Sequence, residues 1–353
     1  LVITRNDSLL YARGFGWADK EKGIKMEPNM LMRFASVSKL ITAVGIMKLQ
    51  EMKKLKLNEK VFGPKGILND TTYNNGIKDQ RYYDITVEQL LRHQAGFNNY
   101  AGDPVSSTRY IMMQNRLTTP PDHKTLLRIL LKRHLGYTPG QGKCYSNLGY
   151  MILSMVIEKK SGMKYENFMQ KYVLHPAGCY DMHIAGTYLK DRRPNETKYY
   201  MHQGSIPVYE YNNSGRLVEK CYGDTDLPRL SGAGAWCGSA AELSRFIASI
   251  DGMPHVKDIL SKKSIQFMTT EQPDHQYSIG WNYTPKSNRP WIRTGSLAGT
   301  SALVLKYPDG QCWILITNTS TWKGHGFSND SMAFFEKLRQ KYMPSMPKKD
   351  LFI

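Results

Sequence analysis

The sequence predicts an α/β fold in which both ends of the chain form one sheet-containing domain and the middle forms a mainly helical insertion. Strand-like runs occur at the start and in the last third of the chain, and most helical patterns lie between them. The 353 residues suffice for about two domains or one large one. We expect an α/β domain of residues 1–60 and 230–345, a helical domain of residues 61–229 and a tail of residues 346–353.

The first predicted elements are a hairpin and a helix. Apolar runs on either side of residues 6–8, a turn-forming Asn-Asp-Ser, predict a hairpin over residues 1–14. A helix is predicted to begin near Ser36 and to end before Asn58. Its buried stripe has helical spacing and consists of Leu40, Val44 and Met47.

Two helices are predicted in the middle of the chain. One begins after Thr86, which can form a capping box with Gln89. The other follows Asn147 and can end at Gly162, because glycine is favoured at helix C-termini. The apolar stripe of this second helix consists of Leu148, Met151, Ile152 and Met155.

The last third of the chain predicts a sheet followed by a helix. β-Rich runs occupy residues 291–294, 301–307 and 312–317, and the last two are joined by a Pro-Asp-Gly-Gln turn. We expect the tail after the closing helix to be loosely held. The apolar face of that helix is predicted to consist of Phe335, Leu338 and Tyr342.

Composition excludes several classes of protein. The chain is 41% hydrophobic, which rules out a wholly disordered protein, and no apolar run is long enough to span a bilayer. The net charge is +18, but the basic residues are scattered and no zinc-finger or RNA-binding motif is present, so we expect no nucleic-acid partner. Neither the nine histidines nor the five cysteines show metal-ligand spacing, so no metal site is predicted. The odd number of cysteines does not indicate a disulfide framework, although one pair could form.

Ser36-Val-Ser-Lys39 is the first chemical motif. Residues three apart share one helix face, so Lys39 can reach the Ser36 hydroxyl. A serine hydroxyl becomes a good nucleophile when a neighbour takes its proton, and a lysine can do this when its pKa is lowered. The pattern also occurs at Ser161/Lys164 and elsewhere by chance, but only Ser36 stands at the head of a striped helix.

Two further motifs could complete a site. In an extended segment, Tyr145 and Asn147 point to the same side, and they offer a phenol for proton relay and an amide to orient a carbonyl. In the β-rich run at 291–294, Arg293 and Thr294 are followed by Gly295 and Ser296, which can line a cleft for an anionic substrate. Each motif alone is weak, but their order along the chain is informative.

In this order the motifs resemble those of the serine β-lactamase-like hydrolases of the class C and D-alanyl-D-alanine carboxypeptidase type. The resemblance covers nearly the whole chain and implies an antiparallel sheet flanked by helices, with an inserted, mainly helical domain. It is carried by residues 34–39, 90–96, 145–150, 232–235 and 277–318.

The resemblance also implies roles for the motif residues. Ser36 would form an acyl-enzyme, Lys39 and Tyr145 would share the proton transfers, and Asn147 would hold the substrate amide or ester. The backbone N–H groups of Ser36 and Ser296 would hold the oxyanion. No cofactor is implied. His93, within residues 90–96, is expected to be structural.

Arg293 departs from the family pattern, in which lysine or histidine is common. Arginine stays protonated and can bind a carboxylate bidentately, so we expect a substrate with an acidic group. We expect a small peptide, ester or β-lactam as the substrate, and peptidoglycan is one candidate.

Two other functions remain open. One is a penicillin-binding-type sensor that is acylated without turnover, and the other is a non-enzymatic protein that binds anionic polymers. The resemblance implies a bacterial, exported protein in the periplasm or at the envelope. The chain opens on Leu1 without a leader, and we expect that a preceding segment has been removed.

Overall fold

The structure, a computed structural model, describes residues 1–99, 102–270, 278–285, 288–324, 326–346 and 349–352. The α-helices are α1 (Ser38–Glu51), α2 (Thr71–Asn74), α3 (Val87–Leu91), α4 (Thr108–Gln114), α5 (His123–Leu130), α6 (Asn147–Ser161), α7 (Tyr165–Met169), α8 (Ser231–Gly234), α9 (Ala240–Ala248), α10 (Lys262–Thr269) and α11 (Gly326–Tyr342). A π-helical segment, η3 (Gln170–Leu174), continues α7, and the short 3₁₀ segments are η1 (Ala35–Val37), η2 (Gln80–Asp84), η4 (His175–Ala177), η5 (Leu189–Asp191), η6 (Lys220–Tyr222), η7 (Pro228–Leu230) and η8 (Met343–Ser345).

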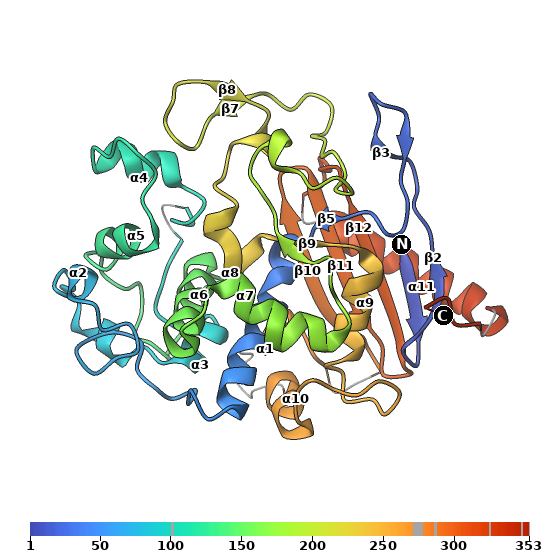
Figure 1. Cartoon of the computed structure of the whole chain (residues 1–353), viewed down its shortest axis with the longest axis horizontal. Helices are drawn as coiled ribbons and strands as arrows, with labels where there is room; N and C mark the ends of the chain where they lie inside the picture. Colours follow the sequence, from blue (N-terminus) through green and yellow to red (C-terminus); the bar gives the residue numbers. More distant parts are fainter. Residues whose placement is uncertain (100–101, 271–277, 286–287, 325, 347–348, 353) are drawn as a thin grey trace.

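The main sheet is antiparallel and joins the two ends of the chain, as predicted (Figure 1). Its strand order is β10-β11-β12-β1-β2, so the N-terminal hairpin pairs with the last strand of the chain. A smaller sheet has the order β5-β9-β6. The strands are β1 (Val2–Arg5), β2 (Ser8–Ala12), β3 (Trp17–Asp19), β4 (Ile24–Lys25), β5 (Met32–Arg33), β6 (His183–Ile184), β7 (Val208–Tyr209), β8 (Leu217–Val218), β9 (Trp236–Gly238), β10 (Trp291–Leu297), β11 (Thr300–Lys306) and β12 (Gln311–Thr317).

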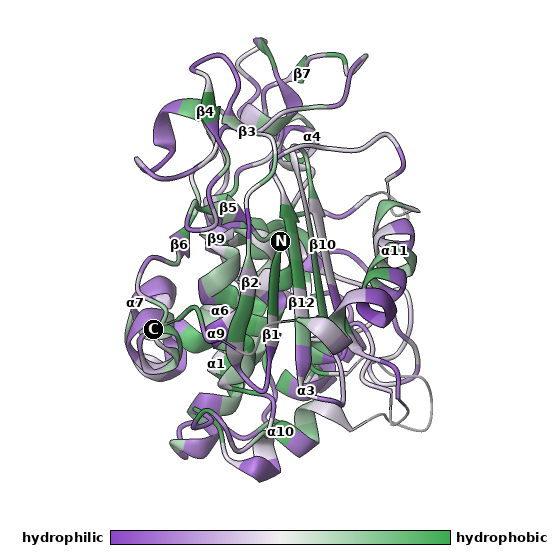
Figure 2. Ribbon diagram, turned by 90° about the vertical axis from the view of Figure 1, so that its right-hand side faces the viewer, coloured by the Kyte–Doolittle hydropathy of each residue, from purple (hydrophilic) through white to green (hydrophobic). Residues whose placement is uncertain are grey.

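Helices cover both faces of the main sheet (Figure 2). Alternate residues of a strand point to opposite faces. Val304 of β11 therefore packs into the large core that contains α1 and α6, while Leu303 and Leu305 pack against Phe335 of α11. The continuous apolar character of β11, which is buried throughout, follows from this two-sided cover.

The predicted helix ends are confirmed. Thr86 and Gln89 form a capping box at α3, and α6 ends at Gly162, whose φ of +71° is the left-handed conformation that favours glycine. The buried helix α1 carries its apolar residues on all sides, because the sheet packs on one flank and α6 on the other.

Two expectations about the C-terminus are wrong. Tyr342 is 46% exposed, and Met343 of the following turn packs beneath α11 in its place. Two residues of the tail are held as well, since Leu351 N–H donates to Leu9 O at 2.8 Å and Asp350 Oδ1 accepts from Leu9 N–H at 2.9 Å. The tail thus adds to the edge of the sheet beside β2, where backbone groups lack another strand.

The five cysteines are free thiols, so the pair that could have formed is not present. No helix among the described residues is long and apolar enough to cross a membrane. The division into a discontinuous domain and a helical insertion stays a prediction.

Replacing Thr86 by alanine should destabilise the fold by about 1 kcal/mol, because Gln89 N–H loses its capping acceptor. The free energy of unfolding in urea measures this. Thr86→Ser, which keeps the hydroxyl, is the matched control and should lose much less. Equal losses in both variants would show that the methyl group, and not the cap, stabilises α3.

Candidate active site

The Ser36 hydroxyl stands on a sharp turn between β5 and α1. Ala35 has a φ of +50°, a left-handed conformation that is unfavourable for a residue with a Cβ atom. The turn is anchored by β9: Phe34 N–H donates to Trp236 O at 2.8 Å, and Trp236 N–H donates to Ser38 Oγ at 3.1 Å. These bonds hold Ser36 at the start of the helix, as the S-x-x-K motif predicted.

Lys39 lies on the same helix face and is fully buried. Its Nζ donates to Ser36 Oγ at 3.3 Å, to Asn147 Oδ1 at 2.6 Å and to Ala233 O at 2.7 Å. Burial lowers the pKa of Lys39, the nearby Tyr145 opposes this shift, and the charge of Arg293 adds to it. The lysine is therefore both fixed in position and easier to deprotonate than an exposed lysine.

Tyr145 and Asn147 lie beside Lys39, on the segment that leads into α6. Lys39 Nζ is 4.7 Å from the centre of the Tyr145 ring. Because a lysine only donates, Asn147 must present Oδ1 to it, and its NH₂ group is then available for a substrate carbonyl. The structure thus brings together Ser36, Lys39, Tyr145 and Asn147 from two segments that are distant in sequence.

His93 supports this segment from below. Its Nδ1 accepts from Ser146 N–H at 3.1 Å, and its ring lies 4.6 Å from that of Tyr145. Burial lowers the pKa of His93 well below its ordinary value, and the charges of Lys39 and Arg293 add to this effect. His93 is therefore a neutral support for the Tyr145 ring, which agrees with the structural role expected from the sequence.

The phenol of Tyr145 is acidic for a buried tyrosine. Burial alone would raise its pKa, but the positive charges of Lys39 and Arg293, together with hydrogen bonds to Lys39 and Ser36, lower the pKa of Tyr145 to about 8. A phenol with this pKa can give up and recover a proton near neutral pH.

Arg293 closes the other side of the site, from the edge strand β10. It is 1% exposed, and its Nε donates to Ser36 O at 2.9 Å. Its Nη2 donates to Ser36 O as well and to Tyr145 Oη at 3.3 Å. In this arrangement the guanidinium binds the backbone of the proposed nucleophile, so its predicted bond to a substrate carboxylate remains a hypothesis.

Gly295 lets β10 run directly against the nucleophile turn. A Cβ atom at this position would lie 2.3 Å from Phe34 O and 2.9 Å from Ser36 N, so no side chain fits. The neighbouring residues face elsewhere: Thr294 N–H donates to Asn282 Oδ1 at 2.8 Å, and Ser296 is exposed. Only the backbone of Ser296 is expected to take part in chemistry.

A cavity of about 180 Å³ opens at the end of β10. It is lined by Leu297 and Ala298 of the strand end, by Ser106 and by a loop that includes Asp224. None of Ser36, Lys39 and Tyr145 lines this cavity, so it is not assigned to the substrate.

The sequence did not reveal several supporting residues. Asp103 Oδ2 accepts from Asn147 N–H at 3.0 Å, and Asn99 Nδ2 donates to Tyr145 O at 2.6 Å. Both residues lie in an irregular polar segment with no recognisable motif, so only the fold places them at the site. Tyr277, part of the resemblance, lies outside the described residues.

The chain is similar to known proteins over most of its length. A family model described as Beta-lactamase matches residues 1–333. Penicillin-binding protein 4* of Bacillus subtilis is 25% identical over 88% of this chain, which spans 65% of the length of that protein. The putative penicillin-binding protein PbpX of the same organism is 27% identical over 89% of this chain and 68% of its own length.

Solved structures share the fold at low sequence identity. A penicillin-binding protein from Bacillus halodurans has a TM-score of 0.69 and 18% identity, and the match covers 96% of this chain and 95% of that one. The D-amino acid amidase of Ochrobactrum anthropi has a TM-score of 0.64 and 18% identity, with 90% of this chain and 85% of that one covered.

A titration should detect the acidic phenol. The difference in ultraviolet absorbance between the wild type and Tyr145→Phe should show one tyrosine ionising with a pKa of about 8, below the ordinary value of about 10. In Lys39→Met, which removes one positive charge, the pKa of Tyr145 should rise. A midpoint at or above about 10 in the wild type would contradict the electrostatic account.

Proposed function

The chain belongs to the Beta-lactamase family, and from this premise we propose that it is a serine hydrolase that cleaves an amide or ester bond through a Ser36 acyl-enzyme. The observation that carries the proposal is the contact of buried Lys39 with Ser36 Oγ at 3.3 Å, next to a tyrosine whose pKa is lowered to about 8. A hydroxyl, a proton acceptor and an orienting amide within one cluster are what acyl transfer requires.

The proposed first step is attack of Ser36 Oγ on the substrate carbonyl carbon. The Ser36 proton passes to the Lys39/Tyr145 pair as the new carbon–oxygen bond forms, and the carbonyl oxygen becomes an oxyanion. The backbone N–H groups of Ser36 and Ser296 would hold that oxyanion, and the close approach that Gly295 permits supports this placement.

The intermediate then collapses. The bond to the leaving amine or alcohol breaks, and that group recovers the proton from the Lys39/Tyr145 pair, which leaves an acyl-enzyme. Water attacks the acyl carbon and gives its proton to the same pair. The bond between the acyl carbon and Ser36 Oγ then breaks, the pair returns the proton to Oγ, and the acid is released. Since the two groups are strongly coupled, the proton is best assigned to the pair and not to either residue.

We propose a peptide or ester with a carboxylate group as substrate. Arg293 supplies a permanent positive charge at the site, and the chain carries a net charge of +18. Peptide, small ester and β-lactam substrates share the carbonyl that Ser36 would attack. The D-amino acid amidase and the penicillin-binding proteins that resemble this chain bear names that fit these substrate classes.

A second candidate is a penicillin-binding-type sensor, which would be acylated but would not turn over. The names of the Bacillus subtilis relatives favour it, and the same Ser36 chemistry would begin the reaction. Because those relatives are bacterial penicillin-binding proteins, we also propose a bacterial, exported protein at the envelope, with peptidoglycan as a candidate partner.

A pre-steady-state measurement with a p-nitrophenyl ester distinguishes these functions. The hydrolase should give a burst of one p-nitrophenol per enzyme followed by turnover, and Ser36→Ala should lose both. A burst without turnover would favour the sensor. The absence of any p-nitrophenol release that depends on Ser36 would contradict both the hydrolase and the sensor. It would favour a non-enzymatic protein that binds anionic polymers.

The role of Arg293 is tested with two substrates that differ only by a carboxylate. If Arg293 binds the carboxylate, Arg293→Ala should lower kcat/KM at least about tenfold more for the acidic substrate than for the neutral one. A tenfold difference corresponds to about 1.4 kcal/mol of transition-state stabilisation. If Arg293 serves only to hold Ser36 O and lower the pKa of Tyr145, both substrates should lose equally. That second result would remove the carboxylate from the proposal.

A further inference from the structure

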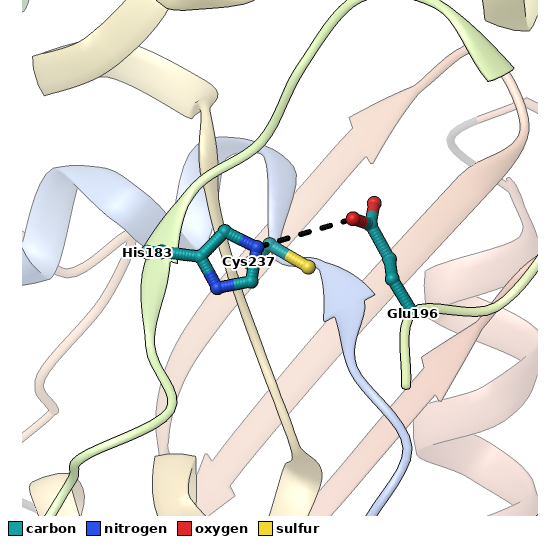
Figure 3. A group of neighbouring side chains, drawn as sticks. All are labelled: His183, Glu196 and Cys237. Atoms are coloured by element: carbon teal, nitrogen blue, oxygen red, sulfur yellow. Dashed lines mark ion pairs between the residues drawn. The ribbon is translucent and has the colours of Figure 1, made fainter. Parts of the chain in front are cut away.

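Three buried side chains with metal-binding atoms meet in the small sheet behind the nucleophile turn (Figure 3). His183 of β6 and Cys237 of β9 are direct partners in the antiparallel register, so their side chains lie on the same face of the sheet. Glu196 comes from the segment after η5, which forms a bridge to Leu31 next to β5. Each of the three residues is at most 5% exposed.

The distances are close to those of a metal centre. One ligand atom from each residue lies within 4.8 Å of the others, and His183 Nε2 is 3.9 Å from Glu196 Oε2. In a tetrahedral zinc site with bonds of about 2.0 to 2.3 Å, the ligand atoms are roughly 3.4 to 3.7 Å apart. The side chains would therefore need to close by about 1 Å or less around an ion.

His183 is oriented as a metal-binding histidine would be. Its Nδ1 lies 3.0 Å from Asp181 O, and because a carbonyl only accepts, Nδ1 carries the hydrogen. In the neutral ring, Nε2 then carries a lone pair, which points toward Glu196 and Cys237. This nitrogen has no hydrogen-bond partner among the described residues. Burying a hydrogen-bond acceptor without a donor costs free energy of folding. Histidines that bind a metal usually donate their other N–H to a carbonyl or carboxylate, as His183 does here.

Tyr199 and Arg33 complete the surroundings. Tyr199 Oη donates to Glu196 Oε1 at 2.8 Å, accepts from Arg33 N–H at 2.9 Å and lies 3.9 Å from Cys237 Sγ. The Arg33 guanidinium lies 4.1 Å from the centre of the Tyr199 ring and donates to Cys221 O and Gly186 O. Tyr199 thus fixes Glu196 from outside, as a supporting residue does in a metal site.

We propose that His183, Glu196 and Cys237 bind one divalent cation of the zinc type. An imidazole, a carboxylate and a thiolate are ligands typical of Zn²⁺ and Co²⁺. On binding, Cys237 releases its thiol proton to solvent, and the metal–sulfur bond forms, so that the +2 ion is balanced by one thiolate and one carboxylate. A water would supply the fourth position.

Without a metal, the same residues suit a different state. In that state Glu196 Oε2 pairs directly with His183 Nε2 across 3.9 Å. Cation binding and this ion pair exclude each other, because both use His183 Nε2 and the Glu196 carboxylate. A binding experiment therefore distinguishes the two states.

The site would have a structural role, because a bound ion would link three segments of the chain. It joins β6 and β9 to the segment that runs beside β5, and β5 leads through Arg33 directly into the turn that carries Ser36. The ion would therefore stabilise the backing of the nucleophile turn without touching a substrate. Its function is independent of the proposed acyl-enzyme, so each proposal can fail alone.

The test uses the full-length chain, stripped with a chelator and titrated with Co²⁺. We expect one equivalent to bind, with a near-ultraviolet thiolate-to-cobalt absorption band that added Zn²⁺ abolishes. Zn²⁺ should also raise the Tm of the wild type. A titration with no such band and less than about 0.1 equivalent of bound Co²⁺ would overturn the proposal in favour of the ion pair.

Variants assign the ligands. Cys237→Ser should lose the thiolate band, and His183→Gln should weaken Co²⁺ binding at least about tenfold. Cys312→Ser is the matched control, because Cys312 is also a buried free cysteine but lies in β12. Ser36→Ala should bind Co²⁺ like the wild type. If Cys237→Ser does not fold, the thiolate band should be kept in Cys312→Ser and weakened in His183→Gln, and a band that His183→Gln leaves unchanged contradicts the proposal.

Discussion

The burial of one lysine ammonium determines the organisation of the site. Lys39 is fully buried, and a buried charge must be surrounded by acceptors. Those acceptors are Ser36 Oγ in η1, Asn147 Oδ1 at the start of α6 and the backbone oxygen of Ala233 in α8. Three helices are therefore tied to one nitrogen atom. A protein with a simple apolar core would not need this arrangement, and the cost of burial is what makes the lysine a usable proton acceptor.

The same charges tune the neighbouring groups in a consistent direction. Lys39 and Arg293 favour the ionised form of Tyr145 and the neutral form of His93, so the phenol becomes more acidic while the imidazole beneath it stays uncharged. Arg293 also holds the carbonyl of Ser36. Ser36 is fixed from two sides. The strained turn at Ala35 holds it on one side, and the Arg293 guanidinium and strand β10 at Gly295 hold it on the other.

The elements with strong local signals were predictable from the sequence. The capping box at Thr86, the glycine at the end of α6 and the turn between β11 and β12 each depend on a few adjacent residues. The motif residues were identified because each lies in a local pattern. Asp103, Asn99 and the group of His183, Glu196 and Cys237 could not be found in this way, since only tertiary packing brings them together. Tyr342 was misplaced because helical spacing does not show where a covering helix leaves the sheet.

The most direct measurement is the mass of the intact protein after acid quenching during reaction with an activated ester or a β-lactam. The account predicts one added acyl group, found by peptide mapping on Ser36, and much slower labelling when Lys39 is replaced by methionine. Acylation at another residue, or labelling of Ser36 at an equal rate without Lys39, would contradict the claim that a buried lysine activates this serine.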